Sequence, residues 1–214
     1  MNYKDTSVVI CCAGLGSRLG IGTTKALIDI NGKPLILHQL ELLKNFDDIR
    51  IVVGHQAREV IDVVKKYRND IMFVFNYDYA TTGPAASLKK ALIGIRKFVI
   101  TLDGDLVINK NDFQKFINYP NQCIVVSNIL TEKPIFATVR NNKVIEFQKK
   151  STYQWTGIAK LNSSKLLKLE NKQNIYELIE PLLPLNGILL KVRGIDTKND
   201  YINAIEWIKK GCDE

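Results

Sequence analysis

The stretch VVICCAGLGSRLG, residues 8–20, joins an apolar run to a loop that carries Gly14, Gly16 and Gly20. The apolar run at residues 8–13 is typical of a buried strand. Because glycines have no side chain, the backbone of such a loop can approach a phosphate closely and direct successive N–H groups at it. The spacing alone leaves three interpretations open: a dinucleotide site, a nucleoside triphosphate site, or a tight turn without a ligand.

Strands and helices alternate regularly through the first half of the chain. Further strands are expected at residues 26–30, 49–54, 71–75 and 97–102, and helices at residues 34–44, 57–67 and 84–95. A turn at Asn31 and Gly32 separates the short strand from the first helix. Long strands that alternate with helices predict a parallel sheet covered on both faces.

The second half of the chain has a different pattern. Four strand-like runs follow one another with only short polar turns between them: QCIVVSNI, IFATV, KVIEFQ and TGIAKL. They are expected to add antiparallel strands to the same sheet. Helices return at residues 163–169, 175–182 and 199–210, with a strand at 187–192 before the last. We therefore predict one α/β domain over residues 1–214, with a mixed, mostly parallel sheet flanked by helices and an antiparallel insertion.

The composition limits the classes of partner. The 214 residues carry a formal net charge of +8, but the lysines are scattered among Asp and Glu. Without a basic block interleaved with aromatics, nucleic-acid binding is not expected, and acidic small molecules are favoured. The chain lacks the roughly 20-residue apolar run of a membrane helix and a secretory signal, so we expect no membrane partner and a cytoplasmic location. Cysteines without metal-type spacing are expected to be free thiols: Cys11, Cys12, Cys123 and Cys212.

The surroundings of the glycine loop separate the two nucleotide interpretations. A dinucleotide site requires a helix that starts within the glycines and an acidic residue at the end of the next long strand. That strand ends at Gly54 and His55, and the segment after Gly16 stays loop-like. The loop instead carries Arg18 and Lys25, whose charges suit a reacting polyphosphate. The residues therefore favour a nucleoside triphosphate.

Residues 13–36, AGLGSRLGIGTTKALIDINGKPLI, resemble the signature of the nucleotidyltransferases that activate sugar 1-phosphates and phosphocholine. That signature reads G-x-G-x-R, then P-K-x-L, then G-K-P-L, and Thr24 stands here where the family usually has proline. The segments IRIVVGH, LDGD and GIDTKNDYINAIEWI continue the similarity over nearly the whole chain. The resemblance implies a Rossmann-like (GT-A-like) fold with an antiparallel insertion, in agreement with the alternation described above.

The resemblance also assigns roles to individual residues. Lys25 is expected to stabilise charge at the transferred phosphate, and Arg18 is expected to contact the β and γ phosphates. The residues expected to bind the nucleotide are Ala13, Gly14, Gly16, Ser17, Asn76, Thr82, Ser87 and Asp103. A phosphate monoester is already a nucleophile near neutral pH, so no general base is expected.

Two acidic residues, Asp103 and Asp105, follow the strand at 97–102 and are expected to face the same crevice as the glycine loop. Mg²⁺ prefers one or two carboxylates together with phosphate oxygens and water. In the resembling enzymes the aspartate after the glycine, here Asp105, binds the metal, and a second ligand corresponds to Asp196. The alternative is structural: a turn or helix cap at Asp103 or Asp105, and a helix N-cap at Asp196.

Residues 75–92 distinguish subgroups of the resembling enzymes. Asn76, Tyr79, Thr82 and Ser87 resemble the pattern of cytidylyltransferases that act on phosphocholine, phosphonates and related phosphorylated amines or amides. CTP is therefore the favoured nucleotide. Phosphocholine and phosphoglutamine are the candidate acceptors, used for the decoration of bacterial capsules or surface polysaccharides. A sugar 1-phosphate nucleotidyltransferase that uses another nucleoside triphosphate is the alternative.

The segment YQWTGIAKLNSSKL resembles the acceptor-side strand of the same subgroup. A cationic choline group requires an aromatic or acidic cage, for which Tyr153, Trp155 and Glu177 are candidates. Core packing is the alternative for both aromatic residues. Lys149 lies where sugar-phosphate members often have a phosphate-binding lysine, and a surface position is its alternative.

Three other classes of function are alternatives to nucleotidyl transfer. The glycine spacing is the basis for an NAD(P)-dependent oxidoreductase. Residues 103–105 also satisfy the D-x-D metal motif of a sugar-nucleotide glycosyltransferase, which would release no pyrophosphate. A catalytically inactive relative is disfavoured because the charged residues of the predicted site are all present. A homodimer is a plausible assembly for any of these.

Overall fold

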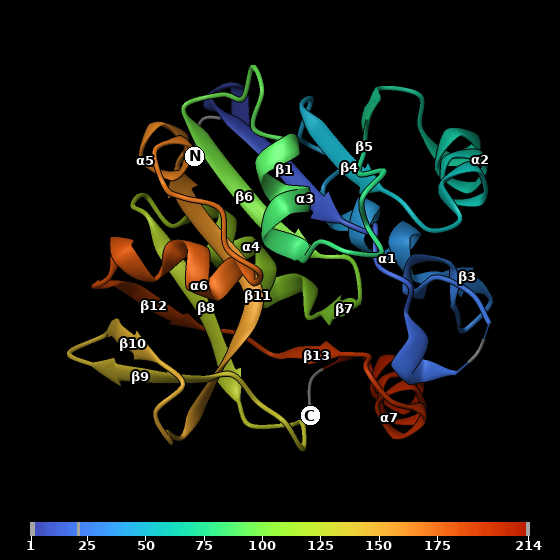
Figure 1. Cartoon of the computed structure of the whole chain (residues 1–214). Helices are drawn as coiled ribbons and strands as arrows, with labels where there is room; N and C mark the ends of the chain where they lie inside the picture. The colour runs from blue at the N-terminus through green and yellow to red at the C-terminus, as the bar shows by residue number, and fades with distance from the viewer. Residues whose placement is uncertain (1–2, 21, 213–214) are drawn as a thin grey trace.

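The computed structural model describes residues 3–20 and 22–212, without the side chain of Arg18. Within these residues, nine strands form one sheet in the order β5-β4-β1-β6-β11-β8-β12-β10-β9. Figure 1 shows this sheet as a layer with helices on both faces. The structure therefore confirms the mixed α/β fold that the sequence predicts.

One half of the sheet is parallel. Its strands are β5 (Ile71–Phe75), β4 (Ile49–Val53), β1 (Thr6–Cys11) and β6 (Phe98–Asp103). Each neighbouring pair runs parallel, so the carboxyl ends of all four strands lie at the same edge of the sheet. The central strand β1 is covered on both faces, which explains why its sequence is a continuous apolar run rather than an alternating one.

The other half is mixed. Its strands are β11 (Tyr153–Asn162), β8 (Cys123–Asn128), β12 (Leu185–Leu189), β10 (Lys143–Phe147) and β9 (Phe136–Arg140). The strand β11 runs antiparallel to both β6 and β8 and so joins the two halves. The pair β10–β9 is antiparallel as expected, whereas β12 runs parallel to β8. The four strands expected to be antiparallel, β8 to β11, therefore pair with one another as predicted, and the later strand β12 adds the parallel pair.

Helices cover each face of the sheet and divide the core in two. On one face lie α1 (Leu35–Leu42), α2 (Ala57–Tyr67) and α4 (Lys110–Asn118), and on the other α3 (Pro84–Lys90), α5 (Ser163–Leu167) and α6 (Ile175–Ile179). Successive side chains of a strand point to opposite faces. Accordingly, Val8 and Ile10 belong to the first core cluster and Val9 to the second. None of the helices in the described ranges is long and apolar enough to span a membrane.

A third, smaller core lies beside the main sheet. It gathers Leu19, Ile30, Leu35, Val107 and Trp207, all buried. The elements that contribute to it or lie near it are β2 (Asp29–Ile30), β3 (Lys33–Pro34), β7 (Leu106–Ile108), β13 (Val192–Gly194) and α7 (Lys198–Lys209). Four short 3₁₀ helices complete the described elements: η1 (Tyr3–Asp5), η2 (Ser17–Leu19), η3 (Lys25–Leu27) and η4 (Glu180–Leu182). This small core packs α7 against residues of β2, β7 and the start of α1.

Some elements differ from the sequence prediction. The strand expected at residues 26–30 begins as the 3₁₀ helix η3, and only its last two residues pair. The helix expected at 84–95 ends at Lys90, followed by turns that include Gly94 at φ +62°. The strand expected at 187–192 divides into β12 and β13, because its two parts pair with different strands.

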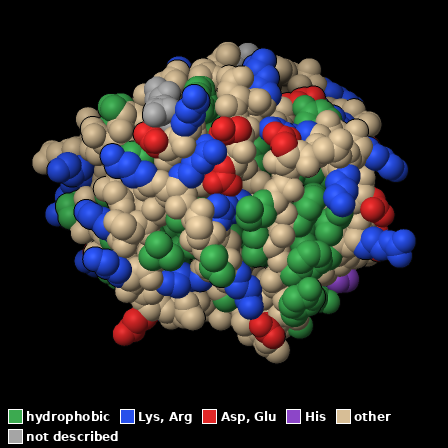
Figure 2. Space-filling model, turned by 90° about the horizontal axis from the view of Figure 1, so that it is seen from above, with side chains coloured by type: hydrophobic (Ala, Val, Ile, Leu, Met, Phe, Trp, Pro, Cys, Tyr) green, Lys and Arg blue, Asp and Glu red, His purple; other side chains and the backbone are tan. Residues whose placement is uncertain are grey.

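On the face of the molecule seen in Figure 2, the charged side chains are scattered, as the sequence pattern indicates. Figure 2 shows one face of the molecule, on which Lys and Arg side chains are spread out and interrupted by Asp, Glu and apolar side chains. The described part of this face carries no continuous basic band. Such a distribution is typical of a solvated surface rather than of a track for a polyanion.

We predict that Gly83→Ala destabilises the fold. A Cβ built at Gly83, just before α3, would lie 2.0 Å from the carbonyl oxygen of Gln173. Relief requires the segment before α6 to move, and overpacking of this kind costs about 1–3 kcal/mol. Urea unfolding should show a lower midpoint at an unchanged slope.

Gly194→Ala is the matched control, because a Cβ there would meet only a Leu106 methyl carbon, at 3.8 Å. Its free energy of unfolding should change by less than about 1 kcal/mol. Equal midpoints for the two variants would contradict the close contact at Gly83.

Candidate active site

A cavity of about 520 Å³ opens at the carboxyl ends of the parallel strands. Cys11 and Cys12 line it at the end of β1, Asn76 directly after β5, and Asp103 at the end of β6. Ligands of open α/β sheets bind at this edge, where loops converge and helices begin. The cavity therefore lies where the sequence predicts a crevice, at the carboxyl ends of the parallel strands.

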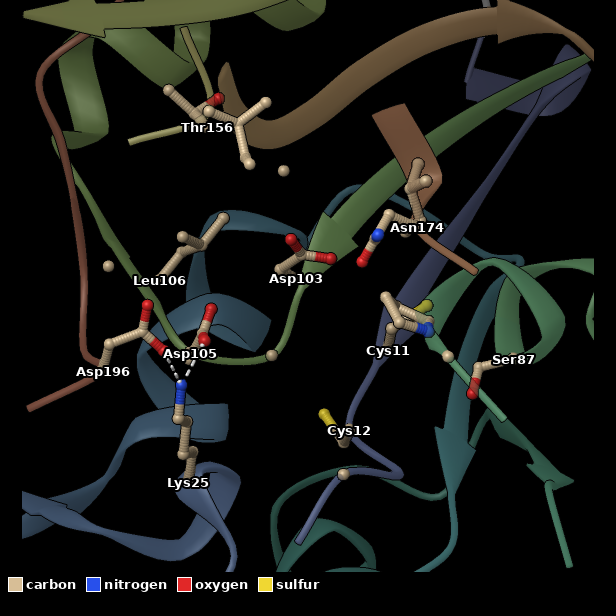
Figure 3. A pocket seen from close by; sticks show the side chains of 18 of the residues that line it. Cys11, Cys12, Lys25, Ser87, Asp103, Asp105, Leu106, Thr156, Asn174 and Asp196 are labelled. Carbon is tan, nitrogen blue, oxygen red and sulfur yellow. Dashed lines mark hydrogen bonds and ion pairs between the residues drawn. The ribbon is translucent and has the colours of Figure 1, made fainter. Parts of the chain in front are cut away.

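Three charged side chains meet in this cavity. Lys25 lies between the carboxylates of Asp105 and Asp196 (Figure 3). Its Nζ donates a hydrogen bond of 2.7 Å to Oδ2 of Asp105 and another to Oδ1 of Asp196. The side chains are 14%, 25% and 34% exposed, so water screens these pairs less than it screens surface pairs. Burial lowers the pKa of Lys25, but the charges and hydrogen bonds of the two aspartates outweigh it and leave the pKa above its ordinary value.

Pairing between distant strands brings the two aspartates together. The strand β13 pairs antiparallel with β7, and the N–H of Ile195 donates to the carbonyl oxygen of Asp105 at 3.0 Å. Because of this pairing, Asp196, the residue after Ile195, lies beside Asp105. On the other side, the Gln56 side chain accepts the N–H of Thr24 at 2.6 Å and so holds the loop just before Lys25.

The structure assigns the nearby helix caps to other residues. At α7, Thr197 is the N-cap and accepts the N–H of Asp200, while the Asp200 carboxylate returns to the N–H of Thr197. At α4, Asn109 is the N-cap and accepts the N–H of Asp112 at 2.9 Å. The carboxylates of Asp105 and Asp196 therefore face the cavity instead of capping these helices.

Asp103 points into a different part of the cavity from Asp105 (Figure 3). Burial and the charge of Asp105 raise the pKa of its carboxyl well above the ordinary value. Gly157 of β11 crosses directly over it: at φ +83°, a Cβ there would lie 2.3 Å from Oδ2 of Asp103. Only glycine combines this backbone conformation with so close an approach.

Only part of the glycine loop lines the cavity. Ala13 and Gly14 line it, whereas Gly16 and Ser17 are not among the lining residues. Gly16 adopts φ +65° and packs against the stem of Lys25, with a built Cβ 3.3 Å from the lysine Cγ. The backbone of Arg18 belongs to η2, and its side chain lies outside the described residues.

A buried polar network lies at the cavity beside α3. The side-chain amide of Asn76 donates to the hydroxyl oxygens of Thr82 and Ser87, each at 3.0 Å. All three residues line the cavity, as does Tyr79. The Oδ1 atom of Asn76 is buried without a partner among the described residues. The network joins the end of β5 to the start of α3.

The predicted acceptor residues occupy different environments. Trp155 lines the cavity, with its ring edge-on to Phe147 at a centroid distance of 5.8 Å. Tyr153 is half-buried against the second core cluster and is not a lining residue. Glu177 accepts the N–H of Asn174 at 2.8 Å and so forms the capping box of α6. Lys149 pairs with Glu146 at 2.9 Å on the surface, outside the cavity.

Several residues that line the cavity were not predicted as site residues from the sequence. On the wall formed by β11, the start of α6 and the β8–β9 connection, they are Thr131, Lys133, Gln154, Thr156, Asn174 and Tyr176. Tyr176 is next to the predicted Glu177, so an aromatic residue at the start of α6 was the available signal. Thr131 and Lys133 lie in the β8–β9 connection, which carries no motif, and only the fold brings them to the cavity.

Solved structures with the same fold include two of bacterial enzymes. One is described as CTP:phosphocholine cytidylyltransferase LicC from Streptococcus pneumoniae, with 24% identity, a TM-score of 0.80, and coverage of 95% of this chain and 99% of that one. The other is described as the inositol-1-phosphate CTP transferase from T. maritima, with 16% identity, a TM-score of 0.80 and 97% coverage of both chains. These similarities show a shared fold.

Curated relatives include the bifunctional protein GlmU of Sulfurimonas denitrificans, 28% identical, covering 95% of this chain and 54% of that protein. GlmU of Methanococcus maripaludis is 31% identical, covering 92% of this chain and 50% of that protein. The chain thus spans about half the length of these two relatives.

The chain therefore has the fold of an NTP transferase domain. Residues 8–179 match the family described as MobA-like NTP transferase domain, and the chain belongs to this family. The matched range begins in β1 and ends with α6, so it includes the glycine loop, Lys25 and Asp105. Asp196 lies beyond it, and its place in the site follows from the β13–β7 ladder.

Proposed function

We propose that this protein transfers a cytidylyl group from CTP to a small phosphorylated acceptor and releases pyrophosphate. The observation that supports this most strongly is the meeting of Lys25, Asp105 and Asp196 in the cavity that follows the glycine loop. Nucleotidyl transfer brings two anions together at the α-phosphorus, and both a cation and fixed positive charge are needed to offset their repulsion. The cavity offers groups for both.

The preference for CTP rests on the end of β5 and the start of α3. Asn76, Thr82 and Ser87 form a fixed polar network on the cavity wall, where a base with its own donors and acceptors would bind. Two structures that share the fold are described as CTP-using enzymes, LicC and the T. maritima transferase. UTP or another nucleotide with a sugar 1-phosphate acceptor is the second candidate.

The aspartates fit a magnesium ion. Asp105 and Asp196 present one oxygen each to the same ammonium nitrogen, so the two carboxylates converge on one point, where they would hold the ion once Lys25 turns to the triphosphate. The described residues contain no cluster of three or more His, Cys, Asp or Glu side chains that would form an all-protein metal site. Mg²⁺ typically binds one or two carboxylates and completes its shell with phosphate oxygens and water. When bound, it would supply positive charge to the triphosphate.

The protein's own residues then have separate tasks. The backbone of Ala13 and Gly14 would hold the triphosphate, and Lys25 would neutralise charge that develops on the transferred phosphate. Arg18 keeps its expected role at the β and γ phosphates. The acceptor phosphate attacks directly, so the proposal assigns no general base.

The acceptor is proposed to lie between β11 and α6. Trp155 and Tyr176 both line this wall, and their rings each pack edge-on against Phe147. Aromatic faces suit a choline-type cation. Phosphocholine and phosphoglutamine are therefore proposed acceptors, and a cytoplasmic role in surface polysaccharide decoration is part of the same proposal.

Pyrophosphate release tests the proposal. The purified protein is incubated with Mg²⁺ and each of four nucleoside triphosphates, against phosphocholine, phosphoglutamine, inositol 1-phosphate and glucose 1-phosphate. We expect the highest rate with CTP and a phosphorylated amine or amide. A higher rate with UTP and glucose 1-phosphate would favour the second candidate. Absence of pyrophosphate with every combination would reject nucleotidyl transfer to these acceptors.

A further inference from the structure

Two lysines line the cavity in the described part of the chain, and they belong to different walls. Lys25 follows the glycine loop and is the first residue of η3. Lys133 lies in the connection between β8 and β9, on the other side of β6 and β11 in the sheet order. The cavity therefore has a source of positive charge on the nucleotide side and another on the acceptor side.

The β8–β9 connection is held against the acceptor wall. The carbonyl oxygen of Ile135 accepts the N–H of Trp155 at 2.7 Å, and the side chain of Gln154 accepts the N–H of Leu130 at 3.3 Å. These hydrogen bonds lie on either side of Lys133 in the sequence. The connection therefore keeps Lys133 near Trp155, the aromatic residue proposed to contact the acceptor.

The two lysines differ in what their ammonium groups already bind. Lys25 is bound by two carboxylates. Lys133 is exposed and has no hydrogen bond or ion pair to any described residue. Lys149, the lysine expected from the sequence to bind a phosphate, pairs with Glu146 outside the cavity. Lys133 is thus the cavity lysine whose charge is available to a ligand.

The reaction requires such a charge. An acceptor phosphate carries negative charge of its own and must approach the α-phosphate of the nucleotide. A lysine ammonium is a compact charge with three donors on a flexible stem, which suits a small phosphate group. Thr131, two residues before Lys133, also lines the cavity and offers a hydroxyl donor to the same group.

From these observations we propose that Lys133 binds the phosphate of the acceptor. This inference rests on the proposed nucleotidyl transfer and adds the group that positions the attacking phosphate. The sequence predicted that Lys149, just after β10, binds this phosphate. We assign that role to Lys133 in the β8–β9 connection instead, because Lys149 lies outside the cavity.

Steady-state kinetics with the best nucleotide and acceptor of the panel test this inference. Lys133→Ala should raise KM for the acceptor by about tenfold or more, since it removes a charge-assisted hydrogen bond. KM for the nucleotide should stay within about twofold, because the binding site for the triphosphate is on the other wall. Lys133→Arg should restore most of the loss. Lys168→Ala, an exposed lysine at the end of α5, is the matched control.

Each result distinguishes the inference from the function on which it rests. An unchanged acceptor KM in Lys133→Ala, with an active wild type, would overturn the role of Lys133 alone. A larger effect of Lys149→Ala than of Lys133→Ala would do the same. Absence of pyrophosphate release by the wild type would reject the proposed function and this inference with it.

Discussion

Lys25→Ala should lower kcat/KM for nucleotidyl transfer by about 10²–10³-fold, the usual cost of removing one fixed donor to developing charge. Lys25 is chosen because its ammonium is held in the cavity by both Asp105 and Asp196. The effect should fall mainly on kcat, because the interaction strengthens as charge builds on the transferred phosphate. Stopped assays of pyrophosphate release at varied nucleotide concentration separate the two parameters.

The matched control is Lys65→Ala, which removes an exposed lysine from α2 without touching the cavity. Urea unfolding of both variants shows whether the fold is retained. A Lys25→Ala enzyme that is folded and keeps a near-wild-type rate would mean that the loop has been assigned to the wrong ligand.

Asp105→Asn should lower the rate by about 10²-fold or more, because metal ions supply several kcal/mol of charge stabilisation in such transfers. The expected mechanism is loss of a carboxylate that holds Mg²⁺ next to the triphosphate. Asp196→Asn should have an effect of similar size. The variants are assayed as a function of Mg²⁺ concentration, and excess Mg²⁺ should restore part of the rate.

The double variant tests whether the aspartates act together. If both bind one ion, the combined loss should be smaller than the product of the two single losses. Asp62→Asn, an exposed aspartate of α2, is the matched control and should keep the wild-type rate. Independent, multiplying losses together with an unchanged requirement for Mg²⁺ would show that the aspartates do not share an ion.

Local periodicity predicted most of the fold. The boundaries of α2 and β5 match the sequence prediction because both segments have an unbroken pattern and are bounded by polar residues. The division of residues 185–194 into β12 and β13 was not predictable in this way. It depends on pairing with β8 and β7, which lie far away in the sequence.

The sequence predicted those residues of the candidate site that lie in recognisable motifs. Lys25, Asp105 and Asp196 lie in short segments with a recognisable pattern, and the structure brings all three together. Glu177 shows the opposite case, because the structure places its carboxylate in the capping box of α6, where it accepts the N–H of Asn174. Lys133 lies in an irregular connection, so only the sheet register could reveal its position at the cavity.

Anomalous diffraction from a crystal soaked with Mn²⁺ and a non-hydrolysable CTP analogue would show directly whether Asp105 and Asp196 hold a metal ion beside the triphosphate. We expect one manganese peak between Asp105 and Asp196, in contact with the triphosphate, and Lys25 turned toward the α-phosphate. A manganese ion held elsewhere in the protein, or a nucleotide bound away from the loop that begins at Ala13, would contradict this expectation.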